Sequence, residues 1–249
     1  MKFNILFGGK AGQGPNILTH LLGKALVRQG YYVFYSRDYQ SLIRGGHNFN
    51  VLTFSDEPVY SNEKEIDILV ALDENTLKIH EKNLKKNGVI LKDNKENMYY
   101  AGRLFKLLCF DFKDLDNELK ELEKKYEENI KYAKQGFEDE KKEVCQIKHN
   151  KTIGFFSSGS QGIAHGSINA GLDIYYAYPM TPATPLLGEL AEKQIENNFL
   201  VLELENEISV IIAAIGSAIT GAKSMVGTSG GGFDLMTEGL SAAGIVEVP

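Results

Sequence analysis

Short apolar runs alternate with stretches of helical spacing along much of the chain. In the last third, apolar runs at 173–177, 199–202 and 224–227 are bounded by turn or polar residues, which predicts three buried strands. Between them, residues 186–195 and 208–219 carry apolar side chains at intervals of three and four, which predicts two helices. Strands and helices in alternation with tight connections indicate an open parallel sheet.

The same alternation fills the first third of the chain. Strands are predicted at 2–7, 31–36, 51–54, 67–72 and 88–91, with helices from Pro15 to Gly30 and between Asn75 and Lys86. This order indicates a doubly wound α/β domain. From Asp114 to Phe137, apolar residues recur every three or four positions among Glu and Lys, which predicts one amphipathic helix. The polar residues that follow, up to Lys151, are interpreted as a linker.

The predicted fold is therefore α/β, with two open parallel-sheet domains. The first covers residues 1–112, the amphipathic helix and linker follow at 113–151, and the second covers residues 152–249. The last residues, Glu247-Val248-Pro249, are expected to lie in a further strand. We therefore expect an incomplete second sheet, and a chain that is a fragment or a shortened form.

Turn residues gather where the predicted strands of the second domain end. Tyr178-Pro179-Met180-Thr181-Pro182 follows the first strand, Glu205-Asn206-Glu207 the second, and Thr228-Ser229-Gly230-Gly231-Gly232 the third. The carboxyl ends of parallel strands meet at one edge of a sheet, and ligands of open α/β folds bind there. We expect the three loops to form one composite site.

A second candidate site is the turn Gly8-Gly9-Lys10-Ala11-Gly12-Gln13-Gly14 in the first domain. A glycine-rich turn from strand to helix can present backbone N–H groups to an anion. The dinucleotide fingerprint is not met, because Ile17 stands where its third glycine belongs. A tight turn that only packs the helix on the sheet explains the motif equally well. Asp38 falls about where a ribose-binding acid would lie, so a nucleotide-binding oxidoreductase on the first domain, with a nicotinamide or flavin cofactor, stays open as an alternative.

A further glycine pair lies in Ile43-Arg44-Gly45-Gly46-His47. Glycines at this position would let the backbone approach an anionic ligand or a neighbouring subunit closely, with Arg44 and His47 on either side. A solvated turn with an exposed Arg44 is the alternative.

Composition narrows the class of protein. The chain has 249 residues, of which 43% are hydrophobic and 24% charged. This composition is typical of a globular protein, and the length suffices for one large or two modest domains. A net charge of -6 argues against a nucleic-acid partner. No apolar run approaches the roughly 18 to 20 residues of a membrane span, and the N-terminus lacks a signal-peptide pattern, so we expect a cytoplasmic protein with no membrane partner. Cys109 and Cys145 lack metal-binding spacing, so we expect no metal ligands in this chain.

Several motifs resemble one enzyme family. YPMTP at 178–182, ENE at 205–207 followed by AAIGSAITGA, and TSGGGFDLMTEGLSAAGI at 228–245 resemble the pyrimidine-binding domain in the alpha subunit of thiamine-diphosphate-dependent 2-oxoacid:ferredoxin oxidoreductases. GGKAGQG and IRGGHN resemble the gamma-type domain of the same family. The likeness is dense over 153–249 and looser over 3–92. It is closest to the 2-oxoglutarate type, in which a gamma-type domain is fused ahead of the alpha subunit.

The resemblance implies a reaction and a set of partners. The reaction is the oxidative decarboxylation of a 2-oxoacid, with 2-oxoglutarate favoured, to an acyl-CoA, and ferredoxin takes the electrons. Thiamine diphosphate would be shared with a beta subunit, Mg²⁺ and a [4Fe–4S] cluster would belong to other subunits, and coenzyme A would be a co-substrate. The chain is thus expected to work in a hetero-oligomer and to be inactive alone.

The resemblance also assigns residues. Glu207, and not Glu205, matches the catalytic glutamate, and Thr181 matches the substrate-side threonine. A glutamate in a dry pocket can share a proton with a ring nitrogen of the aminopyrimidine and so promote the tautomer that acts as internal base. The other residues expected to bind the cofactor are Tyr178, Pro179, Thr228, Ser229, Gly230 and Gly232. Those expected to contact coenzyme A or a subunit are Gly12, Gln13, Gly14, Arg44, Gly45, Gly46 and His47.

Simpler roles and departures from the family keep a third interpretation open. An acid in the first turn of a helix complements the helix dipole, and a Thr beside Pro is often a helix cap. Relatives usually carry Gly-Asn-Glu-Ala where this chain has Gly159-Ser160-Gln161-Gly162, and often Pro and Ser at Gly231 and Asp234. The first domain is also shorter than usual after Asn94. A non-catalytic assembly scaffold is therefore the other alternative.

Overall fold

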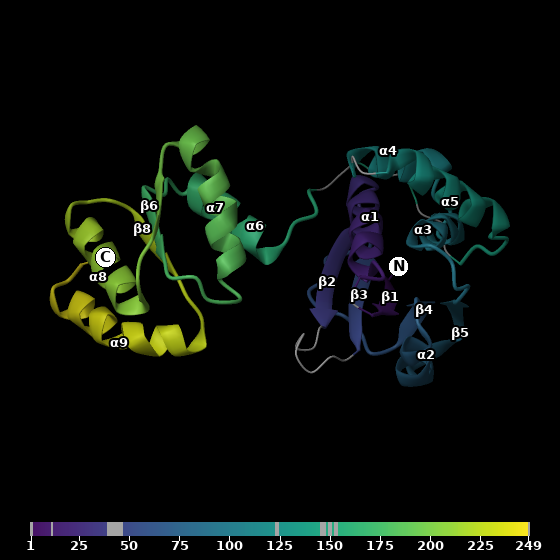
Figure 1. Cartoon of the computed structure of the whole chain (residues 1–249), viewed down its shortest axis with the longest axis horizontal. Helices are drawn as coiled ribbons and strands as arrows, with labels where there is room; N and C mark the ends of the chain where they lie inside the picture. Colours follow the sequence, from purple (N-terminus) through teal and green to yellow (C-terminus); the bar gives the residue numbers. More distant parts are fainter. Residues whose placement is uncertain are drawn as a thin grey trace. The chain divides into compact units, whose positions relative to one another are not determined.

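The computed structural model describes residues 2–10, 12–38, 47–122, 125–144, 148, 151 and 154–248. The chain divides into two compact units, Met1–Phe156 and Ser157–Pro249, and each is described by itself (Figure 1). Over the described residues, no helix combines the length and the apolar character that crossing a membrane demands.

Unit 1 is built on a five-stranded sheet with the order β2-β3-β1-β4-β5. The strands are β1 (Lys2–Gly9), β2 (Tyr32–Asp38), β3 (Asn48–Ser55), β4 (Ile66–Ala71) and β5 (Leu84–Leu91). β1, β4 and β5 run parallel, whereas β3 runs antiparallel to both β1 and β2. The predicted α/β class is confirmed, and the antiparallel β3 is a feature that the sequence pattern did not indicate.

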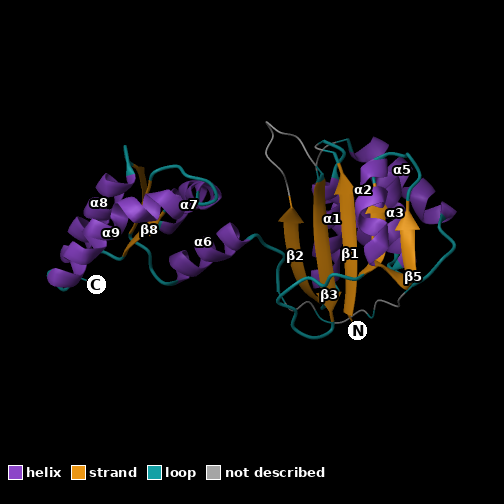
Figure 2. Ribbon diagram, turned by 90° about the horizontal axis from the view of Figure 1, so that it is seen from below, coloured by secondary structure: helices purple, strands orange, loops and turns teal. Residues whose placement is uncertain are grey.

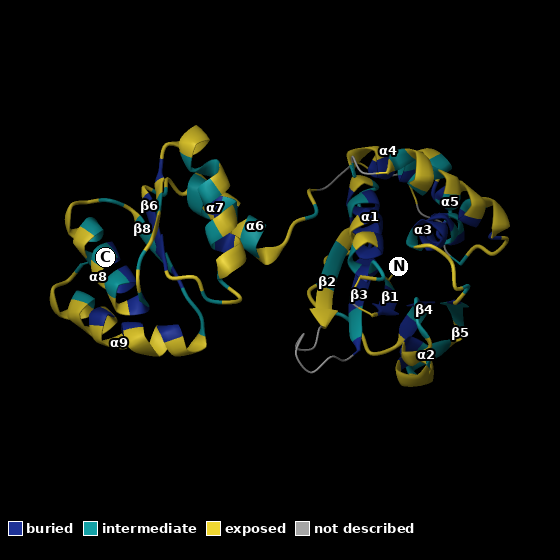
Figure 3. Cartoon of the chain, viewed as in Figure 1, coloured by how far each residue is buried: buried dark blue, intermediate teal, exposed yellow. Residues whose placement is uncertain are grey.

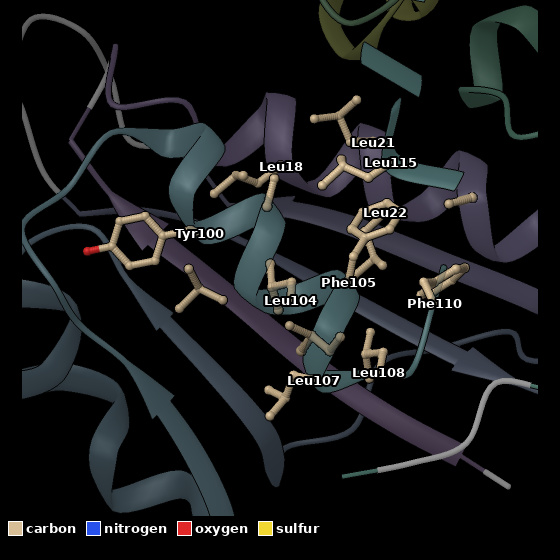
Figure 4. Close-up of a cluster of buried hydrophobic side chains, with 14 of the residues drawn as sticks. Leu18, Leu21, Leu22, Tyr100, Leu104, Phe105, Leu107, Leu108, Phe110 and Leu115 are labelled. Atoms are coloured by element: carbon tan, nitrogen blue, oxygen red, sulfur yellow. The ribbon is translucent and has the colours of Figure 1, made fainter. Parts of the chain in front are cut away.

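Helices cover both faces of this sheet unequally. α1 (Pro15–Arg28), α3 (Asn97–Leu107), α4 (Phe112–Glu121) and α5 (Tyr126–Asp139) share one face, and Figure 2 shows α1, α3 and α5 behind the strands. Their buried side chains form the main core, which includes Leu18, Leu22, Leu104 and Leu115 (Figure 4). On the other face, a smaller apolar cluster includes Leu77 of the short α2 (Glu74–His80).

Two helices of unit 1 differ from the sequence prediction. The helix predicted between Asn75 and Lys86 ends at His80, and after a single 3-10 turn (η1, Glu81–Asn83) the chain enters β5 at Leu84, which pairs with Ile66 of β4. The single amphipathic helix predicted from Asp114 to Phe137 is wrong. It is divided into α4 and α5, and Lys125 before α5 takes a left-handed conformation with φ 53° that cannot continue a helix.

α5 crosses α3 at two glycines. A Cβ atom at Gly102 would lie 2.0 Å from the carbonyl oxygen of Ala133, and one at Gly136 would lie 2.0 Å from the carbonyl oxygen of Tyr99. The backbones therefore touch directly at this crossing. α4 and α5 contribute to the core of unit 1, while the domain boundaries predicted at residues 112 and 151 stay predictions.

Unit 2 contains a three-stranded parallel sheet with the order β7-β6-β8. The strands are β6 (Ile174–Ala177), β7 (Leu200–Glu203) and β8 (Ser224–Gly227). α6 (Gly159–Asn169) and α7 (Thr184–Asn197) contribute to the core on one face, and α8 (Glu207–Ile219) and α9 (Gly230–Ile245) to the core on the other. The central strand β6 is buried along its whole length (Figure 3). The strand predicted at the end is wrong, because Glu247 lies in a turn after α9 and Val248 has no regular secondary structure; Pro249 lies outside the described residues.

Candidate functional site

The three loops predicted to form a composite site leave the same edge of the sheet in unit 2. Ala177, the last residue of β6, is paired with Glu203 at the end of β7 and with Gly227 at the end of β8. Because all three strands are parallel, the segments that follow them begin side by side. The segments that carry Thr181, Glu207 and Thr228 therefore all begin at the same end of the sheet.

Glu207 begins α8 and is enclosed. Asn206 caps the helix, and its side-chain oxygen accepts a hydrogen bond of 2.9 Å from the backbone N–H of Ser209. The Glu207 residue is only 4% exposed, and within the described part of the chain its buried Oε1 atom has no hydrogen-bond partner. A buried carboxyl oxygen without a partner is costly unless a ligand supplies one.

The apolar residues that follow Glu207 along α8 are not all buried. Val210 and Ile211 are buried behind it, but Ile208 and Ile212 are 53% and 54% exposed. Helical spacing explains the difference, because residues one and five positions along from Glu207 lie on another face of α8 than residues three and four positions along. Only Val210 and Ile211 of these four residues are buried with Glu207.

Gly232, in the first turn of α9, lies directly against the carboxyl group of Glu207. A Cβ atom at Gly232 would lie 2.7 Å from Glu207 Oε1 and 2.1 Å from Thr228 Oγ1. Any side chain at position 232 would therefore fill the space between the two groups. The carboxyl of Glu207, the hydroxyl of Thr228 and the first turn of α9 thus surround one small volume.

The neighbouring acid Glu205 has a different environment. It is exposed, and its Oε1 atom accepts a hydrogen bond of 2.5 Å from the Ser209 hydroxyl. That hydrogen bond is the main reason why the pKa of Glu205 lies below its ordinary value. Glu205 therefore has a hydrogen-bond partner within the chain, whereas Oε1 of Glu207 has none among the described residues.

The remaining residues predicted around the site occupy its open side. Tyr178 is 37% exposed, and Pro179 and Thr181 are exposed in the loop between β6 and α7. Ala183, not Thr181, occupies the N-cap of α7, so capping is not the role of Thr181. Ser229 is the N-cap of α9, and its side chain makes no capping hydrogen bond. Gly230 is the first residue of α9 and is exposed.

Tyr175 reaches the same edge and was missed by the sequence prediction. Its side chain is fully buried, and its hydroxyl has no hydrogen-bond partner among the described residues. A Cβ atom at Gly227 would lie 1.8 Å from this hydroxyl oxygen, so the phenol packs against Gly227, the last residue of β8. Burial raises the pKa of Tyr175, which keeps the hydroxyl protonated. In an apolar run a tyrosine looks like core, and only Gly227 on the neighbouring strand could have drawn attention to it.

The glycine-rich turn of unit 1 is closed by its own glutamine. Gly12 and Gly14 have φ angles of +89° and +86°, which other residues rarely adopt. Gln13 Oε1 accepts a hydrogen bond of 2.6 Å from the backbone N–H of Lys10, and Gln13 Nε2 donates one of 3.2 Å to the carbonyl of Leu72. The N–H of Lys10 is therefore occupied within the chain. The predicted contact of this turn with coenzyme A or a subunit stays a prediction.

His47 lies at the start of β3 and is buried. Its Nε2 atom is 2.9 Å from Nε2 of His80, and its ring stacks on Phe49. Burial is the main reason why the pKa values of both histidines are lowered, that of His80 to about 4. Both rings are therefore neutral at pH 7, with one proton between the two Nε2 atoms. The predicted contacts of Arg44, Gly45 and Gly46 lie outside the described residues.

The topology of unit 1 disfavours the nucleotide-binding alternative. In a dinucleotide fold the strand that carries the ribose-binding acid runs parallel beside the first strand. Here the antiparallel β3 separates β2, which ends at Asp38, from β1. Asp38 is consequently on the edge strand and not beside the glycine turn.

Within the described ranges, no group of three or more His, Cys, Asp or Glu residues is placed to hold a metal ion. Cys109 is partly buried, which is the main cause of its raised pKa. Cys145 lies outside the described residues.

Two family descriptions match the chain. Residues 4–119 match pyruvate ferredoxin/flavodoxin oxidoreductase, and residues 165–249 match the thiamine-diphosphate-binding domain of pyruvate flavodoxin/ferredoxin oxidoreductase. Together these ranges span most of the chain, which therefore belongs to the 2-oxoacid:ferredoxin oxidoreductase family, with both matching parts in one polypeptide.

Particular relatives point to the alpha subunit within that family. The chain is 26% identical to a 2-oxoacid:ferredoxin oxidoreductase subunit alpha from Sulfolobus sp, over 100% of this chain and 53% of the relative. It is 38% identical to the 2-oxoglutarate synthase subunit KorA of Archaeoglobus fulgidus, over 36% of this chain and 26% of the relative. The chain spans about half the length of the alpha subunits that it matches over its whole length.

A solved structure has the same fold. The 2-oxoglutarate:ferredoxin oxidoreductase from Magnetococcus marinus superposes with a TM-score of 0.81, over 94% of this chain and 49% of that one. With 21% sequence identity, this likeness establishes the fold alone.

Proposed function

We propose that this chain is the N-terminal part of a fused gamma–alpha subunit of a thiamine-diphosphate-dependent 2-oxoacid:ferredoxin oxidoreductase. The complex would oxidatively decarboxylate a 2-oxoacid to an acyl-CoA and pass the electrons to ferredoxin. The observation that carries the proposal is the buried, unpartnered Oε1 of Glu207 beside Thr228 and Gly232. The match of residues 165–249 to a thiamine-diphosphate-binding domain supports it.

The surroundings of Glu207 fit an aminopyrimidine. Oε1 has no hydrogen-bond partner within the described part of the chain, and a ring nitrogen that shares a proton with it would supply one. Because Gly232 has no Cβ, the α9 backbone packs directly against the Glu207 carboxyl, and the buried Val210 and Ile211 limit the access of water. Thiamine diphosphate, when bound, supplies the nucleophilic carbon and the electron sink for decarboxylation. Glu207 holds the proton that selects the reactive tautomer of the pyrimidine.

Other residues position cofactor and substrate. Tyr178 and Pro179 on one loop, and Thr228 to Gly232 on another, line the cofactor cleft at the sheet edge. Thr181, exposed beside them, offers its hydroxyl to the carboxylate or the oxygen of the 2-oxoacid. Gly230 and Gly232 permit close approach of the α9 backbone, whose N-terminal end favours negative charge.

The remaining components come from partners. A beta subunit would hold the diphosphate with Mg²⁺ and the [4Fe–4S] cluster, and would complete the thiamine site in a cytoplasmic hetero-oligomer. Gly12, Gln13, Gly14 and the segment Arg44–His47 are proposed to contact coenzyme A or another subunit. 2-Oxoglutarate is the favoured substrate, because relatives named 2-oxoglutarate synthase subunit KorA match the chain at 35% to 38% identity over part of its length.

Glu207→Gln tests the proposal in the complex with the beta subunit. The amide keeps the shape of the side chain but cannot hold the proton, so we expect kcat to fall roughly 10² to 10³-fold. The measurement is thiamine- and CoA-dependent reduction of a viologen dye with several 2-oxoacids. Glu205→Gln is the matched control, since Glu205 is exposed and paired with Ser209, and it should keep kcat within about two-fold. Wild-type activity in Glu207→Gln would instead favour the assembly scaffold.

A further inference from the structure

Two buried oxygen atoms that have no hydrogen-bond partner among the described residues approach the end of β8 from opposite faces of the sheet. Glu207 Oε1 comes from the face covered by α8 and α9, and the Tyr175 hydroxyl comes from the face covered by α6 and α7. The first lies beside Gly232 and Thr228, the second against Gly227. Both therefore border the turn from Gly227 to Ser229.

The strand register explains how Tyr175 reaches this turn. Tyr175 is paired with Met225, and Gly227 lies two residues further along β8 on the same face. The ring leans toward the carboxyl edge and takes the space that a side chain at 227 would need, since its oxygen lies 1.8 Å from the position of a Cβ there. Ala164, Leu186 and Leu190 belong to the same buried cluster and hold the ring. The position of the hydroxyl is therefore fixed.

A fixed and unpaired hydroxyl opposes folding. A buried polar group without a hydrogen bond costs about 1–3 kcal/mol, and phenylalanine would fill the same volume without that cost. The adjacent Tyr176 shows the ordinary arrangement, because its hydroxyl lies 2.7 Å from Oγ of Ser217. The hydroxyl of Tyr175 makes no such bond among the described residues, and the raised pKa keeps it a donor.

We propose that Tyr175 is a positioning residue, whose hydroxyl donates a hydrogen bond to a backbone carbonyl of the turn Gly227–Ser229 when thiamine diphosphate binds. The proposal rests on the proposed function of the site. This hydrogen bond would hold Thr228 close to the Glu207 carboxyl. It would thereby favour the conformation of the turn that binds thiamine diphosphate. No bond to the cofactor itself is required.

The test compares Tyr175→Phe with Tyr176→Phe in the complex with the beta subunit. The measurements are the melting temperature without cofactor, the Kd of thiamine diphosphate with Mg²⁺ by calorimetry, and kcat. Tyr175→Phe should melt at or above the wild-type temperature without cofactor, bind thiamine diphosphate about 5- to 10-fold more weakly, and keep kcat within about three-fold. Tyr176→Phe loses a bond present in the unloaded state, so its melting temperature should fall while its Kd stays unchanged.

The outcomes separate this inference from the proposed function. A lower melting temperature of cofactor-free Tyr175→Phe would overturn the inference, since the hydroxyl would then be structural. An unchanged Kd in Tyr175→Phe would overturn it too, provided that the wild type binds thiamine diphosphate and Glu207→Gln binds it more weakly. If the wild-type complex binds no thiamine diphosphate, the proposed function itself fails.

Discussion

Glu118 and Glu207 are both buried acids, each with one oxygen that has no partner among the described residues. They differ in what else surrounds them. Glu207 packs against the backbone of Gly232 and has no ion pair among the described residues, whereas Glu118 pairs with Arg28 at 2.6 Å. A sequence shows both as helical acids among apolar residues. Whether a buried acid can contact a ligand or forms an ion pair depends on the side chains that other helices and strands place around it.

Glu118→Gln should stabilise the protein above neutral pH. Burial outweighs the charge of Arg28 and raises the pKa of Glu118 to about 7, from 4.5. The fold thus prefers the protonated acid, and the stability that this gives is complete below pH 4.5 and lost as the pH rises through 7. Glutamine keeps the neutral form, so we expect a free energy of unfolding about 1–3 kcal/mol above wild type at pH 8, and close to wild type at pH 4.5. Urea unfolding at both pH values measures this.

Glu121→Gln serves as the control for that experiment. Glu121 is on the same helix and bonds the same Arg28, but it is half-exposed and its pKa is lowered by that bond. Its replacement should leave stability at pH 8 equal or slightly lower. A Glu118→Gln protein that unfolds more easily than wild type at pH 8 would show that the ion pair outweighs the cost of burial.

The crossing of α3 and α5 illustrates what can be read at the scale of elements. Apolar periodicity from Asp114 to Phe137 predicted helix where α4 and α5 lie, but not that the left-handed Lys125 ends the continuity before α5. The contacts of Gly102 with Ala133 and of Gly136 with Tyr99 could not be predicted from the sequence, because nothing local marks which glycine touches a distant backbone. The three parallel strands of unit 2 were predicted closely, since each short apolar run is bounded by turn residues. The antiparallel direction of β3 was not predicted, because a short apolar run shows the same pattern in a parallel and in an antiparallel strand.

Gly136→Ala should strongly destabilise unit 1. The added methyl group would lie 2.0 Å from the Tyr99 carbonyl, so α5 must move away from α3 and the core beneath must open. We expect a loss of about 2–3 kcal/mol in the free energy of unfolding. Thermal or urea unfolding measures it.

Gly166→Ala is the matched control, because this helical glycine is exposed and a Cβ there would meet nothing within 4 Å. That substitution should be neutral or stabilise by up to about 1 kcal/mol. Equal effects of the two substitutions would mean that helix propensity, and not the crossing, governs position 136.

The two units differ in charge as well as in fold. Residues 157–249 contain 2 Lys and no Arg against 10 Asp and Glu, a net charge of -8, while the rest of the chain is slightly positive. The core of unit 2 consists of two small clusters on either side of three strands. Self-repulsion and a thin core both lower the stability of a compact state. None of this follows from the net charge of the whole chain, which hides the asymmetry.

The chain should therefore unfold in two calorimetric transitions. We expect unit 2 to melt first, and an increase of NaCl from about 0.02 to 0.5 M to raise this lower transition by several degrees while the upper one moves less. Gly136→Ala should lower only the upper transition, which assigns it to unit 1. A single transition that both changes shift together would show that the units unfold as one.

The packing of the Tyr175 phenol on Gly227 couples two positions that are far apart in the sequence. A methyl group at 227 has room only if the aromatic ring at 175 is replaced by something smaller, and a smaller residue at 175 leaves a void that only a larger residue at 227 can fill. We therefore expect a substitution of Gly227 to be tolerated only together with a smaller residue at position 175.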